Sequence, residues 1–344
     1  MEIKTYDDVL ENARKVLAPK CRVCHDCNGF ACKGEIPGVG GSGSGMSFIR
    51  AREYIKSVTI NMDAVHSHYE ADTSVELFGK NFSYPFFVAP IGGMSFNYTN
   101  VLSEAEYSAA AVKGALDSGI FAFTGDGPKD EIFDTSLPLI KDAGGCVIST
   151  IKPWEMEKCF AKIERIKEAG GMAFAMDIDS ASLINLKLQG KPVYTKSESE
   201  IAELVKCGSP MPFIVKGIMT AKAAEACARA GAYGIVVSNH GGRVMADSPA
   251  PASKLREIRA AVGDSIRIFV DGGIRSGADV FKVLALGADA ALIGRPYGIA
   301  IHGGGAEGVS MLTKRIGGQL EETMLMTGAS KLSEISYEMI NLAE

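Results

Sequence analysis

Apolar residues in this chain gather in short, uninterrupted runs, and each run ends abruptly in polar or glycine residues. Four such runs lie between residues 212 and 297: PFIVKG, GIVVSNHGGR, RIFVDGGIR and ALIGRP. Segments with helical periodicity separate them, such as residues 220–231 (TAKAAEACARAG) and 276–287 (SGADVFKVLALG). Runs of Val, Ile and Phe without alternation suit strands that are buried on both faces, and their alternation with helices predicts a parallel arrangement.

The same pattern extends toward the N-terminus and predicts eight strands. We place them at residues 85–90, 119–125, 145–150, 171–177, 212–217, 234–239, 267–272 and 290–295, with helical patterns such as 101–118 and 154–169 between them. Eight strand–helix units over roughly 250 residues predict an α/β fold, a (β/α)8 TIM barrel, because a doubly wound sheet rarely has eight such units in a row. We expect the last barrel helix at 308–328, and a loop on the functional face plus one helix at 178–210.

The first 80 residues lack this pattern and are predicted to form a small N-terminal cap segment, with the barrel at 81–344. A short helix is expected within residues 1–20, from the apolar positions Val9, Leu10, Ala13 and Leu17. Residues 46–80 predict a helix followed by extended segments. Between them, residues 21–45 have no periodicity and contain seven glycines. This composition predicts a loop in which the backbone adopts conformations that glycine allows and other residues disfavour.

Composition and charge narrow the possible partners. With 344 residues, 47% hydrophobic and 22% charged, the chain can bury a large core in one barrel or in two ordinary domains. The net charge of −5, with acidic and basic residues mixed along the chain, argues against nucleic-acid and anionic-membrane partners. The N-terminus has no apolar leader, and no apolar run is long enough to span a membrane. We therefore expect a cytoplasmic protein without a membrane partner.

Polar and glycine residues at the predicted strand ends mark the expected active-site face of the barrel. Strands seven and eight are followed by glycine-rich turns that carry Arg275 and Arg295. Barrels bind phosphate at this place, through backbone N–H groups and a guanidinium group. The alternative is that these two turns only reverse the chain. Their occurrence at adjacent strand ends favours the phosphate site.

His240, Arg243 and Lys216 are the candidate reactive side chains. His240 lies between an Asn and two glycines, off the apolar pattern, and Arg243 follows about one helical turn later. An imidazole can accept a proton near neutral pH, and an arginine can hold a carboxylate in a bidentate pair. Lys216 ends an apolar strand, so we expect its ammonium group at the barrel mouth, where it could stabilise an electron-rich ring. The alternatives are a structural role for His240 and a salt bridge from Lys216 to Asp177 or Asp271.

These motifs carry a family resemblance. KGIMTAKAAEACARAGAYGIVVSNHGGR, followed by IFVDGGIRSGADVFKVLALGADAALIGRP, resembles the FMN-dependent 2-hydroxy acid oxidase/dehydrogenase family, which includes glycolate and lactate oxidases. The similarity is strong from residue 212 to about 328, weaker from 75 to 177, and absent before about 46.

The resemblance implies a barrel that binds FMN and a small-molecule substrate, a lactate-like 2-hydroxy acid or a related alcohol. By position, His240 would be the base, Asp177 its carboxylate partner and Arg243 the anchor of the substrate carboxylate. Lys216 would stabilise the reduced flavin. The remaining positions that the resemblance assigns to the cofactor are Pro90, Ile91, Gly92, Thr124, Ser238, Asp271, Gly272, Gly273, Arg275, Gly294 and Arg295. The family also suggests a homotetramer or larger oligomer.

Three departures from the family pattern leave the substrate open. The second substrate-binding arginine is replaced by Ile184, and no arginine occurs between Arg165 and Arg229. The tyrosine of strand three is missing from the run at 146–150, and the tyrosine motif near the N-terminus is replaced by the cysteine/glycine loop. Each lost hydrogen bond is worth roughly 1–3 kcal/mol, enough together to change specificity by orders of magnitude.

Four cysteines in the N-terminal loop, Cys21, Cys24, Cys27 and Cys32, have the spacing C-x2-C-x2-C-x4-C. Thiolates at this spacing could bind zinc or an iron–sulfur cluster, and the three at x2 spacing are similar to ferredoxin ligands. The alternatives are packed free thiols and a redox-active thiol pair. No residue of the barrel site is predicted to bind a metal.

The sequence is also compatible with two other functions. A non-redox FMN enzyme similar to the type 2 isopentenyl diphosphate isomerases would need a basic cluster for a diphosphate. A flavin-dependent electron-transfer or sensor module, with the cysteine loop as its output, would explain the missing substrate residues.

Overall fold

The central feature of the fold is a closed parallel barrel. The computed structural model describes residues 3–183, 186 and 188–342. In this part of the chain, eight strands close in the order β10-β11-β4-β5-β6-β7-β8-β9. They are β4 (Phe86–Val88), β5 (Ala122–Thr124), β6 (Val147–Ile151), β7 (Phe174–Asp177), β8 (Phe213–Ile218), β9 (Gly234–Val237), β10 (Arg267–Asp271) and β11 (Ala290–Ile293). The predicted TIM barrel and its eight strands are confirmed.

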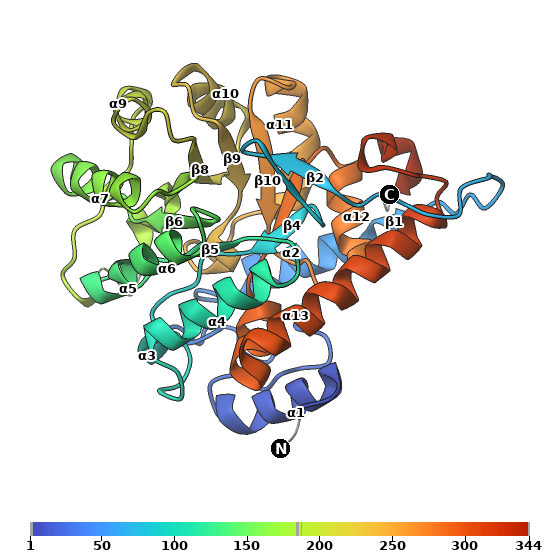
Figure 1. Cartoon of the computed structure of the whole chain (residues 1–344), viewed down its shortest axis with the longest axis horizontal. Coiled ribbons are helices and arrows are strands. Elements are labelled where there is room, and N and C mark those ends of the chain that lie inside the picture. Colours follow the sequence, from blue (N-terminus) through green and yellow to red (C-terminus); the bar gives the residue numbers. More distant parts are fainter. Residues whose placement is uncertain (1–2, 184–185, 187, 343–344) are drawn as a thin grey trace.

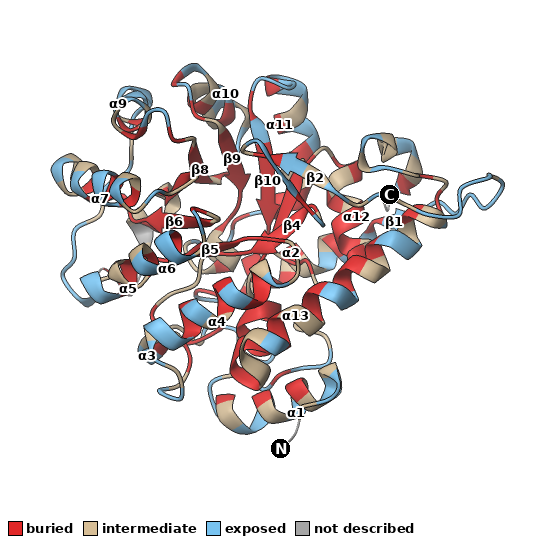
Figure 2. Cartoon of the chain, in the orientation of Figure 1, coloured by how far each residue is buried: buried red, intermediate tan, exposed pale blue. Residues whose placement is uncertain are grey.

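Burial on both faces explains why the strand sequences are apolar without alternation. Side chains fill the barrel interior, and a ring of helices covers the outside, so that the strands are almost wholly buried (Figure 2). The ring consists of α4 (Glu104–Leu116), α6 (Ser136–Asp142), α7 (Met156–Glu168), α9 (Glu198–Gly208), α10 (Ala221–Arg229), α11 (Leu255–Val262), α12 (Gly277–Ala285) and α13 (Arg295–Leu325) (Figure 1).

The start of the last helix was predicted wrongly. Instead of beginning near residue 308, α13 begins at Arg295 and bends at Gly305, which has a left-handed backbone with φ of 57°. The glycines around residue 304 serve helix packing. A Cβ at Gly303 would lie 2.1 Å from the carbonyl oxygen of Val9 in α1 (Tyr6–Leu17), so glycine is what lets α1 approach α13.

The first 80 residues cover both ends of the barrel. The hairpin of β2 (Val75–Leu77) and β3 (Lys80–Phe82) packs Phe82 against Phe121, and Phe78 against Tyr233, with ring centroids 4.8 Å apart in each pair. Phe121 and Tyr233 directly precede β5 and β9, so the hairpin closes the N-terminal end of the barrel.

The opposite end of the barrel is covered by α2 (Met46–Ser57) and the cysteine/glycine loop before it. The Ser47 hydroxyl donates to the carbonyl oxygen of Met245 at 2.6 Å, in the loop after β9. Arg52 pairs with Asp279 at 2.8 Å, beyond β10. These contacts place residues 21–57 at the carboxyl ends of the strands, where barrel enzymes carry their sites.

Three shorter elements complete the described fold: α3 (Met94–Asn97) and α5 (Asp130–Asp134) follow β4 and β5, and β1 (Thr59–Ile60) pairs with β12 (Ile340–Asn341). Among the described helices, none combines the length and the apolar character needed to cross a membrane.

Close packing of α12 on α13 provides a test of this architecture. A Cβ at Gly277 would lie 2.1 Å from the backbone nitrogen of Leu320, whereas a Cβ at Gly318 in the same α13 would meet nothing within 4 Å. We expect Gly277→Ala to lower the free energy of unfolding by about 1–3 kcal/mol through overpacking. Gly318→Ala should raise it by up to about 1 kcal/mol, because alanine is the better helix former. Urea unfolding of both variants measures the difference, and equal effects would contradict the described packing.

Candidate functional site

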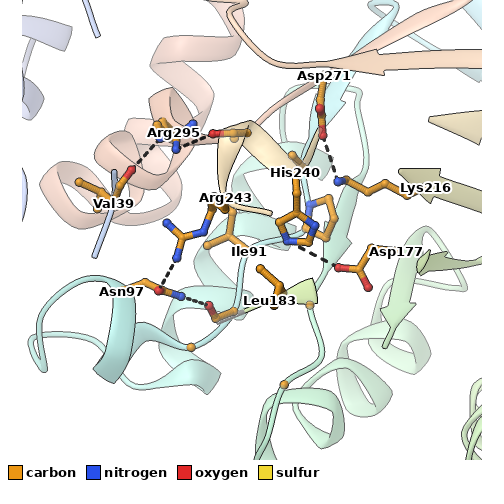
Figure 3. A pocket seen from close by; sticks show the side chains of 18 of the residues that line it. Val39, Ile91, Asn97, Asp177, Leu183, Lys216, His240, Arg243, Asp271 and Arg295 are labelled. Carbon is orange, nitrogen blue, oxygen red and sulfur yellow. Dashed lines mark hydrogen bonds and ion pairs between the residues drawn. The ribbon is translucent and has the colours of Figure 1, made fainter. Parts of the chain in front are cut away.

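A large cavity opens at the carboxyl ends of the barrel strands (Figure 3). It measures about 1250 Å³ when counted out to its open mouth. Its wall contains residues that follow the barrel strands, and also Gly38 and Val39 of the N-terminal loop. The predicted site residues that line it are Pro90, Ile91, Gly92, Asp177, Lys216, His240, Arg243, Asp271, Gly272, Gly273, Arg275, Gly294 and Arg295. Thr124 and Ser238 lie at the ends of the neighbouring strands and are buried.

His240 is held in the cavity by an unusual backbone. Its φ of 58° is in the left-handed region, which is costly for a residue with a side chain. The turn is fixed by two hydrogen bonds: the His240 N–H donates to the Ser238 hydroxyl at 3.0 Å, and the Gly242 N–H donates to the Asn239 side-chain oxygen at 3.0 Å. Backbone strain of this kind is typical of functional sites. It fixes the position of the imidazole ring.

The hydrogen-bond partner of His240 is Asp179 and not the expected Asp177. His240 Nδ1 lies 2.9 Å from Asp179 Oδ1, whereas His240 Nε2 and Asp177 Oδ2 are 3.8 Å apart. Asp177 instead accepts a hydrogen bond from the Lys152 ammonium group. The two aspartates differ in their place in the fold. Asp177 is the last residue of β7, whereas Asp179 lies in the 3-10 turn that follows (Ile178–Ser182). The turn carries Asp179 to the imidazole.

Three buried carboxylates and two buried ammonium groups balance one another around His240. Lys216 Nζ lies 3.3 Å from Asp271 Oδ2, so the salt bridge considered for Lys216 is present. Burial lowers the pKa of Lys216, but the charges of Asp271, Asp179 and Asp177 outweigh it and raise the net pKa. Burial likewise raises the pKa of Asp179, and the charges of His240 and Lys216 outweigh it, so the net pKa is lowered. Both groups are therefore charged at neutral pH.

Asp177, Asp179 and His240 could also hold a metal ion by geometry alone, since one ligand atom from each lies within 4.8 Å of the others. The two lysines already supply the compensating positive charge at these carboxylates. Asp179 Oδ2 is nevertheless a buried oxygen without a hydrogen-bond partner among the described residues.

Arg243, Arg275 and Arg295 all bind backbone carbonyl oxygens of the N-terminal loop. The Arg243 guanidinium donates to Gly38 at 2.6 Å, that of Arg275 to Cys27 at 2.8 Å, and that of Arg295 to Val39 at 2.8 Å. Arg243 also donates to the Asn97 side-chain oxygen at 2.7 Å. The predicted roles of these arginines, substrate binding for Arg243 and phosphate binding for the other two, remain predictions. The contacts show that the same side chains hold the loop on the barrel.

Sequence analysis missed three residues of the site: Lys152, Asp179 and Asn97. Lys152 could have been found, because β6 ends at Ile151, one residue later than predicted, and a lysine directly after a buried strand faces the barrel mouth. Asn97 lies at the end of α3, several residues after β4, and no sequence pattern marks it as a site residue. Ile184, at the position of the family's second arginine, lies outside the described residues.

The four cysteines of the loop line a second, smaller cavity beside the first. Both cavities share Val39, Tyr98 and Arg295 in their walls. Burial raises the pKa of Cys21 to about 11. Cys24, in contrast, is exposed.

Comparisons with known proteins agree with the barrel and its site. The sequence model of a family described as FMN-dependent dehydrogenase matches residues 39–200 and 187–342. An L-lactate oxidase of Lactobacillus jensenii is 30% identical over 77% of this chain and 70% of its own length. A 4-hydroxymandelate oxidase of Amycolatopsis orientalis is 28% identical over 85% of this chain and 89% of its own length. An L-lactate oxidase of a Roseobacter species is 40% identical, but that alignment spans only 44% of this chain and 40% of the relative.

Solved structures show the same fold along the whole chain. A mandelate oxidase mutant with (S)-mandelic acid superimposes with a TM-score of 0.80 and 25% identity, covering 100% of both chains. A mandelate oxidase with benzoyl-formic acid gives a TM-score of 0.79 at 25% identity, covering 99% of this chain and 98% of the other.

The cavity suits FMN. Asp271 Oδ1 and Thr124 Oγ1, both at positions assigned to the cofactor, are buried polar atoms without a hydrogen-bond partner among the described residues. Buried polar atoms in proteins normally have partners, so a polar ligand is expected there.

The lowered pKa of Asp179 predicts a pH-dependent contribution to stability. Because the native pKa is below the ordinary value near 3.9, the charged carboxylate stabilises the fold above about pH 4, and this stability is lost as the pH falls through the native pKa. We expect Asp179→Asn to cost about 1–3 kcal/mol of unfolding free energy at pH 7, and less below pH 4.

Denaturant unfolding of the holoenzyme across this pH range measures the effect. Asp264→Asn, at a fully exposed carboxylate, is the control and should change little at either pH. A cost for Asp179→Asn that stays constant with pH would contradict the assignment.

Proposed function

The chain belongs to the FMN-dependent dehydrogenase family, and we propose that it oxidises a small 2-hydroxy acid to the corresponding 2-oxo acid. The observation that carries this proposal is the arrangement of His240 in the cavity, with its ring hydrogen-bonded to Asp179 and the positively charged Lys216 close by. The relatives named lactate oxidase and hydroxymandelate oxidase support the substrate class.

His240 is the proposed base. Asp179 accepts a hydrogen bond from Nδ1, and this holds the neutral ring in the tautomer whose Nε2 has a free lone pair. Nε2 takes the proton of the substrate's α-hydroxyl group, and the carboxylates of Asp179 and Asp177 then stabilise the imidazolium. When bound, FMN would supply the acceptor for the electrons and the hydrogen that leave the α-carbon.

Lys216 has the electrostatic role at the cofactor. Its ammonium group is buried and held at the end of β8 by the Ser238 hydroxyl, 2.9 Å away, and by Asp271. A buried positive charge stabilises negative charge more strongly than one in water, since the local dielectric constant is low. Lys216 thereby favours the reduced, anionic form of the flavin.

Two cationic side chains are candidates for the substrate carboxylate. Arg243 is in the cavity wall, and burial together with the nearby charge of Arg295 lowers its pKa to about 10, so it stays charged at pH 7. Lys152 lines the same cavity and supplies a positive charge in a chain that lacks the family's second arginine. Arg243 is the stronger candidate because a guanidinium group binds a carboxylate through two parallel hydrogen bonds.

A diphosphate isomerase is not favoured. Such an enzyme needs basic groups for a diphosphate beyond those used for FMN, and Arg275 and Arg295 are the residues already assigned to the FMN phosphate. The curated relatives named above are also 2-hydroxy acid oxidases.

Anaerobic mixing of the FMN-loaded protein with lactate, glycolate, mandelate and 4-hydroxymandelate tests the proposal. We expect at least one acid to bleach the flavin absorbance, with formation of the 2-oxo acid. An oxidised flavin spectrum with every acid, in protein that a chemical reductant does bleach, would contradict the assigned function.

His240→Ala tests the assigned base. The variant should retain FMN, because His240 is not assigned to cofactor binding, and it should reduce the flavin at least 100-fold more slowly, which is the lower end of what a general base contributes. His68→Ala, at an exposed histidine, is the control. Flavin reduction by His240→Ala at the wild-type rate would refute the role.

Arg243→Lys tests the carboxylate anchor. Lysine keeps the charge but loses the bidentate geometry, so we expect KM to rise about tenfold or more with a smaller change in kcat. FMN content checks that the cavity is intact. A change in kcat alone would indicate that Arg243 orients the reacting groups without anchoring the substrate.

A further inference from the structure

The proposed oxidation makes no use of the four cysteines of the N-terminal loop. Cys21, Cys24, Cys27 and Cys32 nevertheless line one cavity, and their thiols are close enough for their charges to act on one another. Four of the twelve residues from Cys21 to Cys32 are cysteines that line this cavity, so the loop forms much of its wall. Core packing alone does not explain why four cysteines line the same cavity.

Local backbone conformations bring the cysteines together. Val23 has a left-handed φ of 46°, and its N–H donates to Cys21 Sγ at 3.4 Å. Gly29, with φ of 91°, could not carry a side chain, since a Cβ would lie 2.8 Å from the Phe48 ring. Hydrogen bonds from backbone N–H groups to sulfur are typical of cysteines that ligate metal clusters.

The distances between the sulfur atoms argue against a single zinc ion. Four thiolates at about 2.3 Å from a tetrahedral ion must lie about 3.8 Å from one another. Among the described residues, the four thiols do not form a group that is placed to hold one metal ion. An iron–sulfur cluster spreads its cysteine ligands more widely, because each ligand binds a different iron of the cluster or shares an iron with one other.

The surroundings also suit a cluster. Besides the cysteines, the lining of the cavity includes the side chains of Val39, Tyr98 and Ile299. The buried Arg295 guanidinium lies near Cys27 and Cys32 and would offset part of the negative charge of thiolate ligands. Cys24 is exposed, which gives one side of the cavity access to solvent.

We propose that Cys21, Cys24, Cys27 and Cys32 ligate an iron–sulfur cluster in the second cavity. The ligand set is complete within residues 21–32, and three of its members have the x2 spacing of bacterial ferredoxins. The spacing to the fourth cysteine is x4 and differs from the ferredoxin spacing. The proposal therefore rests on the position of the four cysteines around one cavity as well as on their spacing.

The position of the cysteine site beside the catalytic cavity indicates a role in electron transfer. This inference rests on the proposed function. Val39, Tyr98 and Arg295 separate the two cavities as a shared wall. Oxidation of a 2-hydroxy acid to a 2-oxo acid releases two electrons and two protons. The electrons would leave through the cluster one at a time, past Cys24, to an external one-electron acceptor, and the protons would pass to solvent.

Metal analysis tests the site independently of any activity. Full-length protein purified without oxygen should contain iron and acid-labile sulfide in equal amounts, about two or four of each per chain, and give an electron paramagnetic resonance signal after chemical reduction. Cys24→Ser with Cys27→Ser should lose both elements and keep FMN. Cys146→Ser with Cys207→Ser, outside the loop, is the matched control and should keep all three. Stoichiometric zinc, no metal, or iron retained in the loop variant would overturn the proposal.

A second measurement tests the relay. With the acid that bleaches the flavin, the Cys24→Ser and Cys27→Ser variant should reduce the flavin at the wild-type rate but pass electrons to a one-electron acceptor protein at least tenfold more slowly. Unchanged transfer would overturn the relay. If no acid bleaches the flavin, the proposed function fails, and photoreduction of the flavin then replaces the acid as the electron source.

Discussion

The N-terminal loop depends on three arginine side chains that reach it from consecutive barrel strands. Arg243, Arg275 and Arg295 follow β9, β10 and β11, and their guanidinium groups bind carbonyl oxygens between Cys27 and Gly40. The Arg295 guanidinium is buried, which lowers its pKa, so this cation loses much of its hydration. The carbonyl groups compensate for it, and the loop carbonyls in turn find their partners in the barrel. Loop and barrel mouth therefore stabilise each other.

Glycine is necessary within the loop and where α2 meets the barrel. A Cβ at Gly40 would lie 1.8 Å from the carbonyl oxygen of Cys32, and one at Gly242 would lie 2.5 Å from the backbone nitrogen of Phe48. Side chains at these positions would move the carbonyl groups away from the arginines. The glycine-rich composition of residues 21–45 thus follows from the close approach of two backbones. It also fixes where the cysteines lie relative to the catalytic cavity.

Sequence patterns could predict the barrel but only part of the site. Burial on both faces of each strand leaves a local signal, so the strands and the residues that follow them could be found, including His240 and Lys216. Asp179 was missed because the partner of a histidine depends on how a short turn rotates after β7, and Asp177 and Asp179 are equally near in sequence. The arginine–loop contacts join residues about 200 or more positions apart, so no local pattern reveals them. The start of α13 was placed too late, and the role of its glycines in packing against α1 leaves no local pattern.

The same contacts explain how a substrate carboxylate can be bound without the family's second arginine and tyrosines. In the described structure Arg243 donates to the neutral carbonyl oxygens of Gly38 and Gly40 and to the amide of Asn97. Hydrogen bonds from a cation to a carboxylate are roughly twice as strong as hydrogen bonds between neutral groups, so a carboxylate entering the cavity would compete well for the guanidinium. The released carbonyl of Gly38 would then face the cavity that it already lines. Under the proposed function, binding of the acid would be coupled to the contacts that Arg243 makes with the N-terminal loop.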